Sequence, residues 1–142
     1  MPPEGLDWVP RDELLTFEEI ERVSRLLVEQ FGIESIRITG GEPTVRAHLP
    51  VLIEKLSQLP VDLSMTTNGA TLRTLSNDLV QAGLKRINIS LDSLRPDRFT
   101  ELTLRDNLPQ VLDGIQAAVD SGLNPVKVNM VVMAGVNDDE II

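Results

Sequence analysis

The stretch Ile36-Arg37-Ile38-Thr39-Gly40-Gly41-Glu42-Pro43 joins a β-branched run to a pair of glycines. The run predicts a strand, and the glycines at its end predict a tight turn. Glycines leave the main chain open to a ligand, and Pro43 stiffens the exit because its ring fixes φ and removes the amide hydrogen. Parallel α/β folds place their ligands at such turns, beyond the carboxyl ends of the strands. Taken alone, the turn fits a ligand loop and a plain connection equally well.

The rest of the chain alternates helices and strands around this junction. The predicted helices cover residues 16–31, 49–58, 72–82 and 108–120, and the predicted strands cover 35–39, 62–67, 86–91 and 126–132. Thr16 and Glu19 have capping-box spacing, and Asn107 is the expected cap of the last helix. A glycine and then an apolar residue end three of the helices, at Gly32, Gly83 and Gly122. The repeated order predicts an α/β fold of about four parallel βα units, preceded by a proline-containing loop over the first dozen residues.

The faces of the predicted strands differ in polarity. Side chains alternate between the two faces of a strand, and one face here is apolar. The opposite face is mostly polar and contains Arg37, Thr39, Ser64, Thr66, Asn68, Asn88, Ser90, Asp92, Lys127 and Asn129. A parallel sheet with helices on both faces would be apolar throughout, and a closed eight-stranded barrel would fill its interior with branched apolar side chains. We therefore expect helices on one face and a polar, ligand-sized inner face; a solvent-facing sheet without a ligand is the alternative.

Two inward cations are notable in an acidic chain. Arg37 and Lys127 lie on separate predicted strands and indicate a phosphate or carboxylate ligand. The alternative is that they pair with Asp92, Glu42 or another inward acid. The acids at 138–140 follow Asn137 and fit the first turn of a helix better than a cation site.

Composition limits the classes of function. The chain has 142 residues, with 22 acidic and 13 basic side chains and a formal net charge of -9. This acidity argues against general binding to nucleic acid or to an anionic membrane. No apolar run of about 18 residues and no signal peptide are evident, so we expect a cytoplasmic protein. The chain contains no cysteine, which removes disulfides, thiol catalysis and cysteine-ligated metals.

The same residues resemble a known family. The resemblance lies in 14–17 (Leu-Leu-Thr-Phe), 39–43 (Thr-Gly-Gly-Glu-Pro), 66–69 (Thr-Thr-Asn-Gly), 88–93 (Asn-Ile-Ser-Leu-Asp-Ser), 127–129 (Lys-Val-Asn) and 135–140 (Gly-Val-Asn-Asp-Asp-Glu). The ordered set resembles the radical S-adenosylmethionine enzymes and, within them, the GTP 3′,8-cyclase family of molybdenum-cofactor biosynthesis. The Gly-Gly-Glu-Pro turn is typical of the superfamily, and the complete set is far more specific.

The resemblance implies a partial (βα) barrel and assigns roles by position. The expected cofactor-binding residues are Gly41, Ser90, Gly40, Glu42 and Asn68. Gly41 and Ser90 are expected to contact S-adenosylmethionine with help from Asn68, while Gly40 and Glu42 shape the turn. GTP is expected at Arg37, Thr66 and Lys127. Asp92 and Asn129 face the same way and are expected to support these contacts. The resemblance identifies no catalytic residue and no metal ligand in this chain.

The resemblance also implies 4Fe–4S clusters held by cysteines that this chain lacks. In the family, a three-cysteine motif ends one residue before a Met-Pro pair, and this chain begins with Met1-Pro2. We therefore expect residues 1–142 to be the central part of a longer barrel domain, inactive when isolated. Strands 35–39 and 126–132 would then be free sheet edges, prone to self-association. Another radical S-adenosylmethionine enzyme fragment and a cluster-free nucleotide-binding βα module are the alternatives.

Overall fold

Four parallel strands form one sheet, and their order in the sheet, β1-β2-β3-β4, is their order in the chain. The computed structural model describes residue 10 and residues 13–141, so the loop predicted for the first dozen residues lies mostly outside the described part. The elements are α1 (Phe17–Phe31), β1 (Ser35–Ile38), η2 (Pro43–Val45), α2 (Leu49–Ser57), β2 (Asp62–Thr67), α3 (Leu72–Gln81), β3 (Arg86–Ser90), α4 (Pro96–Thr103), α5 (Leu108–Asp120), β4 (Val126–Asn129) and η3 (Asp138–Glu140).

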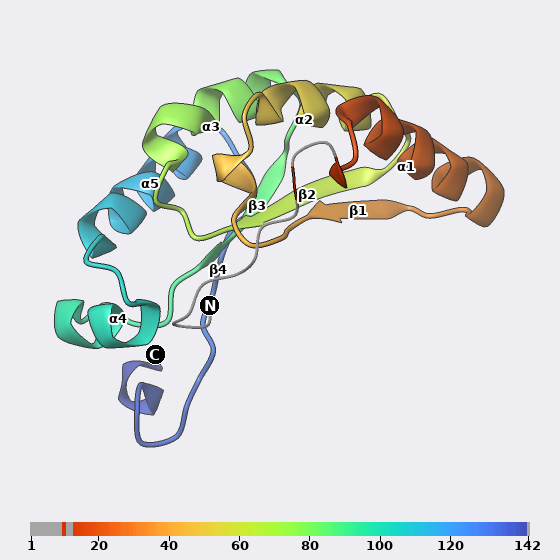
Figure 1. Cartoon of the computed structure of the whole chain (residues 1–142). Coiled ribbons are helices and arrows are strands. Elements are labelled where there is room, and N and C mark those ends of the chain that lie inside the picture. The colour runs from red at the N-terminus through yellow and green to blue at the C-terminus, as the bar shows by residue number, and fades with distance from the viewer. Residues whose placement is uncertain (1–9, 11–12, 142) are drawn as a thin grey trace.

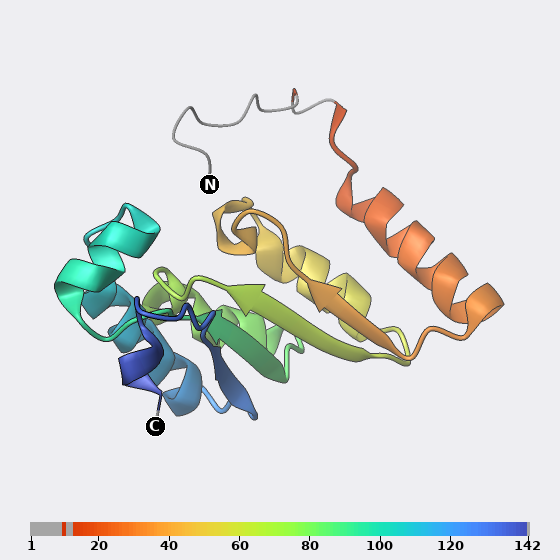
Figure 2. The same ribbon diagram turned by 90° about the horizontal axis from the view of Figure 1, so that it is seen from below.

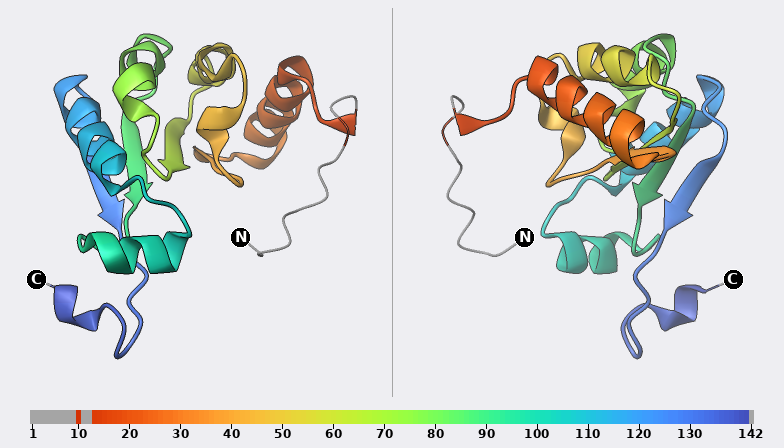
Figure 3. Two further views of the ribbon diagram at one scale, coloured as in Figure 1. Left: turned by 60° about the vertical axis from the view of Figure 1, so that its left-hand side comes forward. Right: turned by 90° about the vertical axis from the view of Figure 1, so that its right-hand side faces the viewer.

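Helices cover one face of the sheet. Helices α1, α2, α3 and α5 arch over the strands in Figure 1, and the other face is open in the view from below in Figure 2. Helix α4 and the short η3 lie beyond the carboxyl ends of β3 and β4 (Figure 3). The predicted α/β fold of about four βα units, with helices on a single face, is therefore confirmed.

The core lies between this sheet face and the helices. Its fully buried side chains include Ile53 of α2, Met65 of β2, Leu72 and Leu79 of α3, Ile87 and Ile89 of β3, and Val111 of α5. These are the apolar positions that alternate along the strands and recur at helical spacing. Helix α1 lies at the edge of the layer and contains no buried residue, so it is the least covered helix. Among the described residues, no helix is both long enough and apolar enough to cross a bilayer.

The predicted capping box and the three glycines at helix ends behave as expected, whereas the predicted cap at Asn107 does so only in position. The Thr16 hydroxyl accepts a hydrogen bond from the Glu19 amide, and the Glu19 carboxylate accepts one from the Thr16 amide, which completes the capping box. Gly32, Gly83 and Gly122 have φ values of 65°, 104° and 92°. Asn107 stands at the cap position of α5, but its side chain makes no capping bond, so that prediction is correct in position and wrong in contact.

Two predictions about elements were wrong. The last strand ends at Asn129 rather than at residue 132, because β3 turns away after Ser90 and leaves no main-chain partner for Val131. Helix α4 was not predicted; it is short, begins at Pro96 and buries only Phe99, so its apolar periodicity is weak. The other predicted boundaries agree with the structure to within one residue, and those of α5 and β2 are identical to it.

A contact between two glycines fixes α5 against the turn after β2. A Cβ added at Gly114 of α5 would overlap the carbonyl oxygen of Gly69, and one added at Gly69 would lie 2.9 Å from Cγ2 of Ile89. Gly69 also has a φ of 81°, in the left-handed region that glycine adopts without strain. Glycine at both positions therefore lets α5 approach the carboxyl end of β2.

We expect Gly114→Ala to lower the free energy of unfolding by about 1–3 kcal/mol, because the new methyl group must push α5 away from the turn. Urea unfolding of the two proteins measures the difference. Gly41→Ala is the matched control, since a Cβ at Gly41 meets no atom within 4 Å. Equal losses in the two variants would contradict the packing explanation.

Candidate functional site

The turn after β1 exposes its main chain. Gly40 and Gly41 are both exposed, and a Cβ added at either would meet no atom within 4 Å. Gly40 has a φ of 155°, which L side chains rarely adopt. The amides and carbonyls of this turn are therefore accessible to a ligand at the carboxyl edge of the sheet.

Glu42 bonds to residues of two neighbouring βα units and holds this turn in place. Its Oε1 accepts hydrogen bonds from the Thr44 amide (3.1 Å), the Thr44 hydroxyl (2.6 Å) and the Thr67 hydroxyl (2.6 Å). Its Oε2 accepts one from the Asn68 amide at 2.7 Å. The carboxylate thus caps η2 and joins the loop after β1 to the end of β2. Glu42 was predicted to shape the turn, and in the structure its hydrogen bonds hold the turn in place.

A second contact joins the same loop to the residues before α1. The Arg46 guanidinium donates a hydrogen bond to the Leu15 carbonyl at 2.6 Å and lies 4.9 Å from the centre of the Phe17 ring. An arginine over an aromatic face adds an electrostatic attraction to the contact. The loop after β1 is therefore fixed on both sides, by Glu42 to β2 and by Arg46 to α1.

Asn68 follows β2 and has a fixed side chain. Its Oδ1 accepts a hydrogen bond from the Ala70 amide at 3.0 Å, while the Thr67 hydroxyl accepts one from the Gly69 amide at 3.1 Å. These are the local turns that Asn and Thr side chains favour. The remaining amide nitrogen of Asn68 is the donor that this side chain can offer to a ligand.

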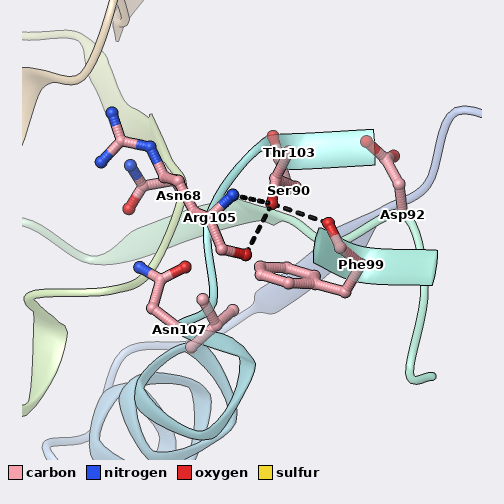
Figure 4. Close-up of a pocket in the computed structure, with 8 residues that line it drawn as sticks. Asn68, Ser90, Asp92, Phe99, Thr103, Arg105 and Asn107 are labelled. Carbon is pink, nitrogen blue, oxygen red and sulfur yellow. Dashed lines mark hydrogen bonds between the residues drawn. The ribbon is translucent and has the colours of Figure 1, made fainter. Parts of the chain in front are cut away.

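A cavity of about 150 Å³ lies at the carboxyl ends of β2 and β3. Its lining residues are Asn68, Ser90, Asp92, Phe99, Thr103, Arg105, Asn107 and Val111 (Figure 4). Thr103 closes one side, because its hydroxyl bonds to the Phe99 carbonyl at 2.7 Å and to the Arg105 main chain at 3.2 Å. The structure thus brings the predicted residues Asn68 and Ser90 together in one cavity, whereas Gly40 and Gly41 do not line it.

Arg37 and Lys127 form no ion pair within the part of the chain that the structure describes. Arg37 is aligned with Ser64, whereas Lys127 lies in one row with Asn88 and Thr66, two residues further along β2. By strand spacing, Thr66 and Lys127 are about 10 Å apart and Arg37 and Lys127 about 15 Å apart at the backbone. Both cations are exposed, and neither forms a salt bridge with another described residue. In the described residues, the predicted alternative of pairing with Asp92 or Glu42 is therefore not found.

Arg86 is a third cation of the inner face and was missed. It aligns with Ser64 in the row that contains Arg37, and it forms an ion pair with Asp62. Its Nε is buried without a partner among the described residues. The alternation of side chains along β3 already placed Arg86 on the same face as Asn88 and Ser90, so the signal was present at the first residue of the strand.

The acids at the end of the chain form a helical turn, as predicted, and they pair with α4. Asp139 forms salt bridges with Arg95 at 2.8 Å and Arg98 at 2.7 Å, and Glu140 also contacts Arg98. The pKa of Glu140 is lowered, first by the hydrogen bond from the Leu94 amide and then by that from the Ser93 hydroxyl. The pKa of Asp139 is lowered mainly by Arg98. No group of three or more acids or histidines among the described residues is arranged to hold a metal ion.

The fold and the site define a class of protein. One parallel sheet carries helices on a single face, an open glycine turn at its carboxyl edge and exposed cations on its uncovered face. This is an α/β protein with the fold of a partial barrel, and its inner face and carboxyl edge are where such folds place polar or anionic ligands.

Comparison with known proteins identifies the family. The profile of the Radical SAM superfamily matches residues 5–142. GTP 3′,8-cyclases of Streptomyces coelicolor and Alkaliphilus metalliredigens are each 49% identical to the chain, covering 99% of it and 42% and 44% of their own lengths. The GTP 3′,8-cyclase of Pelotomaculum thermopropionicum is 46% identical over 100% of this chain and 44% of its own length. The chain therefore belongs to the radical S-adenosylmethionine superfamily, and it spans less than half the length of the curated relatives that it matches.

The two cofactors of this superfamily fit the chain differently. The open main chain at Gly41 and the polar cavity at Ser90 suit a ligand with amino, carboxylate and hydroxyl groups, such as S-adenosylmethionine. A 4Fe–4S cluster requires thiolate ligands, and the 142 residues include no cysteine. The donor set of this chain does not fit the cluster.

We expect Glu42→Ala to lower the free energy of unfolding by at least about 1.5–3 kcal/mol. The substitution removes a charged hydrogen-bond acceptor and leaves the Thr67 hydroxyl and the Asn68 amide without their partner. Urea unfolding measures the loss, and amide exchange at Asn68 should accelerate. Glu29→Ala on the exposed side of α1 is the matched control. Unchanged exchange at Asn68 in Glu42→Ala would show that the carboxylate does not hold the two loops together.

Proposed function

We propose that this chain is the central part of the barrel domain of a GTP 3′,8-cyclase. Such an enzyme converts GTP to (8S)-3′,8-cyclo-7,8-dihydroguanosine 5′-triphosphate in the biosynthesis of the molybdenum cofactor. Identities of 46–49% to GTP 3′,8-cyclases support the proposal. The observation that carries it is the pair of exposed cations, Arg37 and Lys127, on the inner face of the sheet whose carboxyl edge bears the open turn at Gly40 and Gly41.

The proposed cofactor contacts use both sides of the carboxyl edge. Main-chain groups of Gly41 bind the methionine part of S-adenosylmethionine, while Gly40 and Glu42 keep the turn open. Ser90 and Asn68 contact the same molecule from the cavity that they share. The cofactor supplies a 5′-deoxyadenosyl radical in the superfamily; the residues of this chain bind and orient it.

The proposed substrate contacts lie deeper on the inner face. Arg37 and Lys127 neutralise the phosphates of GTP from opposite edge strands, and Thr66 contributes a hydroxyl in the same row as Lys127. Their separation suits a ligand with charge spread along a triphosphate rather than a single carboxylate. The net charge of -9 disfavours nucleic acid or an anionic membrane as a partner, and it is compatible with a local basic site.

We expect GTP to bind this chain only weakly, because much of the relatives' length is absent from it. An NMR titration with GTP should shift the amide signals of Arg37, Thr66 and Lys127, with an affinity weaker than micromolar. Arg37→Ala and Lys127→Ala should each weaken binding about fivefold or more, as expected for loss of a charge-assisted contact. Arg22→Ala, on exposed α1, should change nothing. Identical titrations of all four proteins would refute the substrate assignment.

We expect the isolated chain to be catalytically inactive, because radical formation requires electron transfer from a cluster that this chain has no thiolates to bind. Anaerobic reconstitution with iron and sulfide should therefore give no visible absorption of a bound 4Fe–4S cluster and no cleavage of S-adenosylmethionine. A cluster that co-purifies with the chain on gel filtration would overturn this expectation.

We also propose that the free sheet edges cause self-association of this chain, as a homodimer or a larger species, in a cytoplasmic setting. Strands β1 and β4 each have one neighbour in the described sheet. Val128 of β4 is 50% exposed and Phe31 beside β1 is 77% exposed. Unpaired strand edges with apolar neighbours readily pair with another chain.

Sedimentation velocity at increasing concentration tests the self-association, and we expect a rising average mass. Val128→Lys should shift the distribution toward monomer, since a lysine disfavours pairing at an edge strand. Val119→Lys replaces a similarly exposed valine on α5 and is the control. A monodisperse monomer at high concentration would contradict the proposal.

A further inference from the structure

Main-chain pairing between β3 and β4 ends just before the cavity. The amide of Leu91 donates to the Asn129 carbonyl at 2.9 Å, which is the last main-chain hydrogen bond between these two segments. Beyond it, the Val131 amide donates instead to Oδ1 of Asp92 at 2.8 Å. The side chain of Asp92, which lines the cavity, thus accepts the hydrogen bond that a main-chain carbonyl of β3 would accept if the strand pairing continued.

Asn137, in the loop after β4, adds further side-chain hydrogen bonds between this loop and the loop after β3. Its Nδ2 donates to the Asp92 carbonyl at 2.8 Å and to the Val131 carbonyl at 2.9 Å. Its Oδ1 accepts from the Met133 amide at 2.7 Å. The residue is 0% exposed, so both amide hydrogens and the amide oxygen are used away from water.

Glu140 forms hydrogen bonds with the loop after β3 at a second point. Its Oε2 accepts from the Leu94 amide and its Oε1 from the Ser93 hydroxyl, both at 2.7 Å. The guanidinium of Arg98 contacts the carboxylate from α4. The segment 131–140 therefore holds the loop after β3 at Asp92 and again at Ser93 and Leu94.

We propose that Asn137 is a positioning residue of the cofactor site, and that Glu140 supports it. Together they fix the loop that carries Asp92, two residues after Ser90, so that both side chains face the cavity in one arrangement. The nature of the ligand rests on the proposed function. The opposite side of the site, at Gly40 and Gly41, is held by Glu42, whose hydrogen bonds among the described residues go to Thr44, Thr67 and Asn68 and not to this segment.

This separation provides the test. The probe is S-adenosylmethionine at millimolar concentration, followed by amide NMR shifts at Ser90 and Gly41 in the 142-residue chain. Asn137→Ala should weaken the affinity about tenfold, as expected for the loss of buried hydrogen bonds. The shift at Ser90 should shrink while the shift at Gly41 persists at saturation, which uniform destabilisation would not produce.

One control variant and two variants of Glu140 complete the test. Asn77→Ala, on the exposed side of α3, should behave as the unaltered chain. Glu140→Ala should reproduce the selective change at Ser90 to a smaller extent. Glu140→Gln should keep most of the normal Ser90 shift, because the amide oxygen of the glutamine can still accept the hydrogen bond from the Leu94 amide. If Asn137→Ala does not fold, the two Glu140 variants decide the question.

Two results would overturn the inference. One is an unchanged Ser90 shift and affinity in folded Asn137→Ala; the other is equal loss at Ser90 and Gly41. If the unaltered chain shows no shift with S-adenosylmethionine, the proposed cofactor contacts of this chain fail. Amide exchange at Val131 and Leu94 then decides the positioning role. Faster exchange at both amides in Asn137→Ala, with Asn77→Ala unchanged, supports the role, and unchanged exchange refutes it.

Discussion

Both oxygens of the Glu42 carboxylate accept hydrogen bonds from the end of β2, through the Thr67 hydroxyl and the Asn68 amide. The same carboxylate caps η2 through Thr44. Two consecutive βα units are thereby joined at the carboxyl ends of their strands, beyond Ile38 and Met65, the last residues that pair between β1 and β2. Since Asn68 lines the cavity and Gly40 and Gly41 lie just before Glu42, one acid sets the spacing between the two halves of the candidate site.

Much of the architecture could be predicted because it depends on local chemistry. The capping box at Thr16 and the glycines after three helices signal where helices begin and end, independently of the rest of the chain. Alternation along the strands predicted which face would be covered. It also predicted that Arg37 and Lys127 would share the uncovered face, and the register places them there. Short-range patterns suffice for these features.

The features that could not be predicted depend on contacts distant in sequence. Asn137 is buried only because the loops after β3 and β4 meet around it. Its hydrogen-bond partner Asp92 lies 45 residues earlier in the chain. The overlong prediction for the last strand has the same origin, since Val131 and Val132 have strand-like side chains but no strand beside them. Likewise, the use of Glu42 as a cross-link requires knowing that Thr67 lies next to it. Sequence periodicity carries no information about such pairings.

The match between strand order and chain order has a consequence for how the molecule forms. In the described sheet, β2 and β3 each pair with the strand before and the strand after them in the chain, so the sheet grows by adding neighbours rather than by inserting strands. Proteins built this way can assemble stepwise, with loop-closure entropy lost over one unit at a time. An arc of such units can therefore hold its shape without closing into a ring, and its ends can accept further strands without rearranging those already in place.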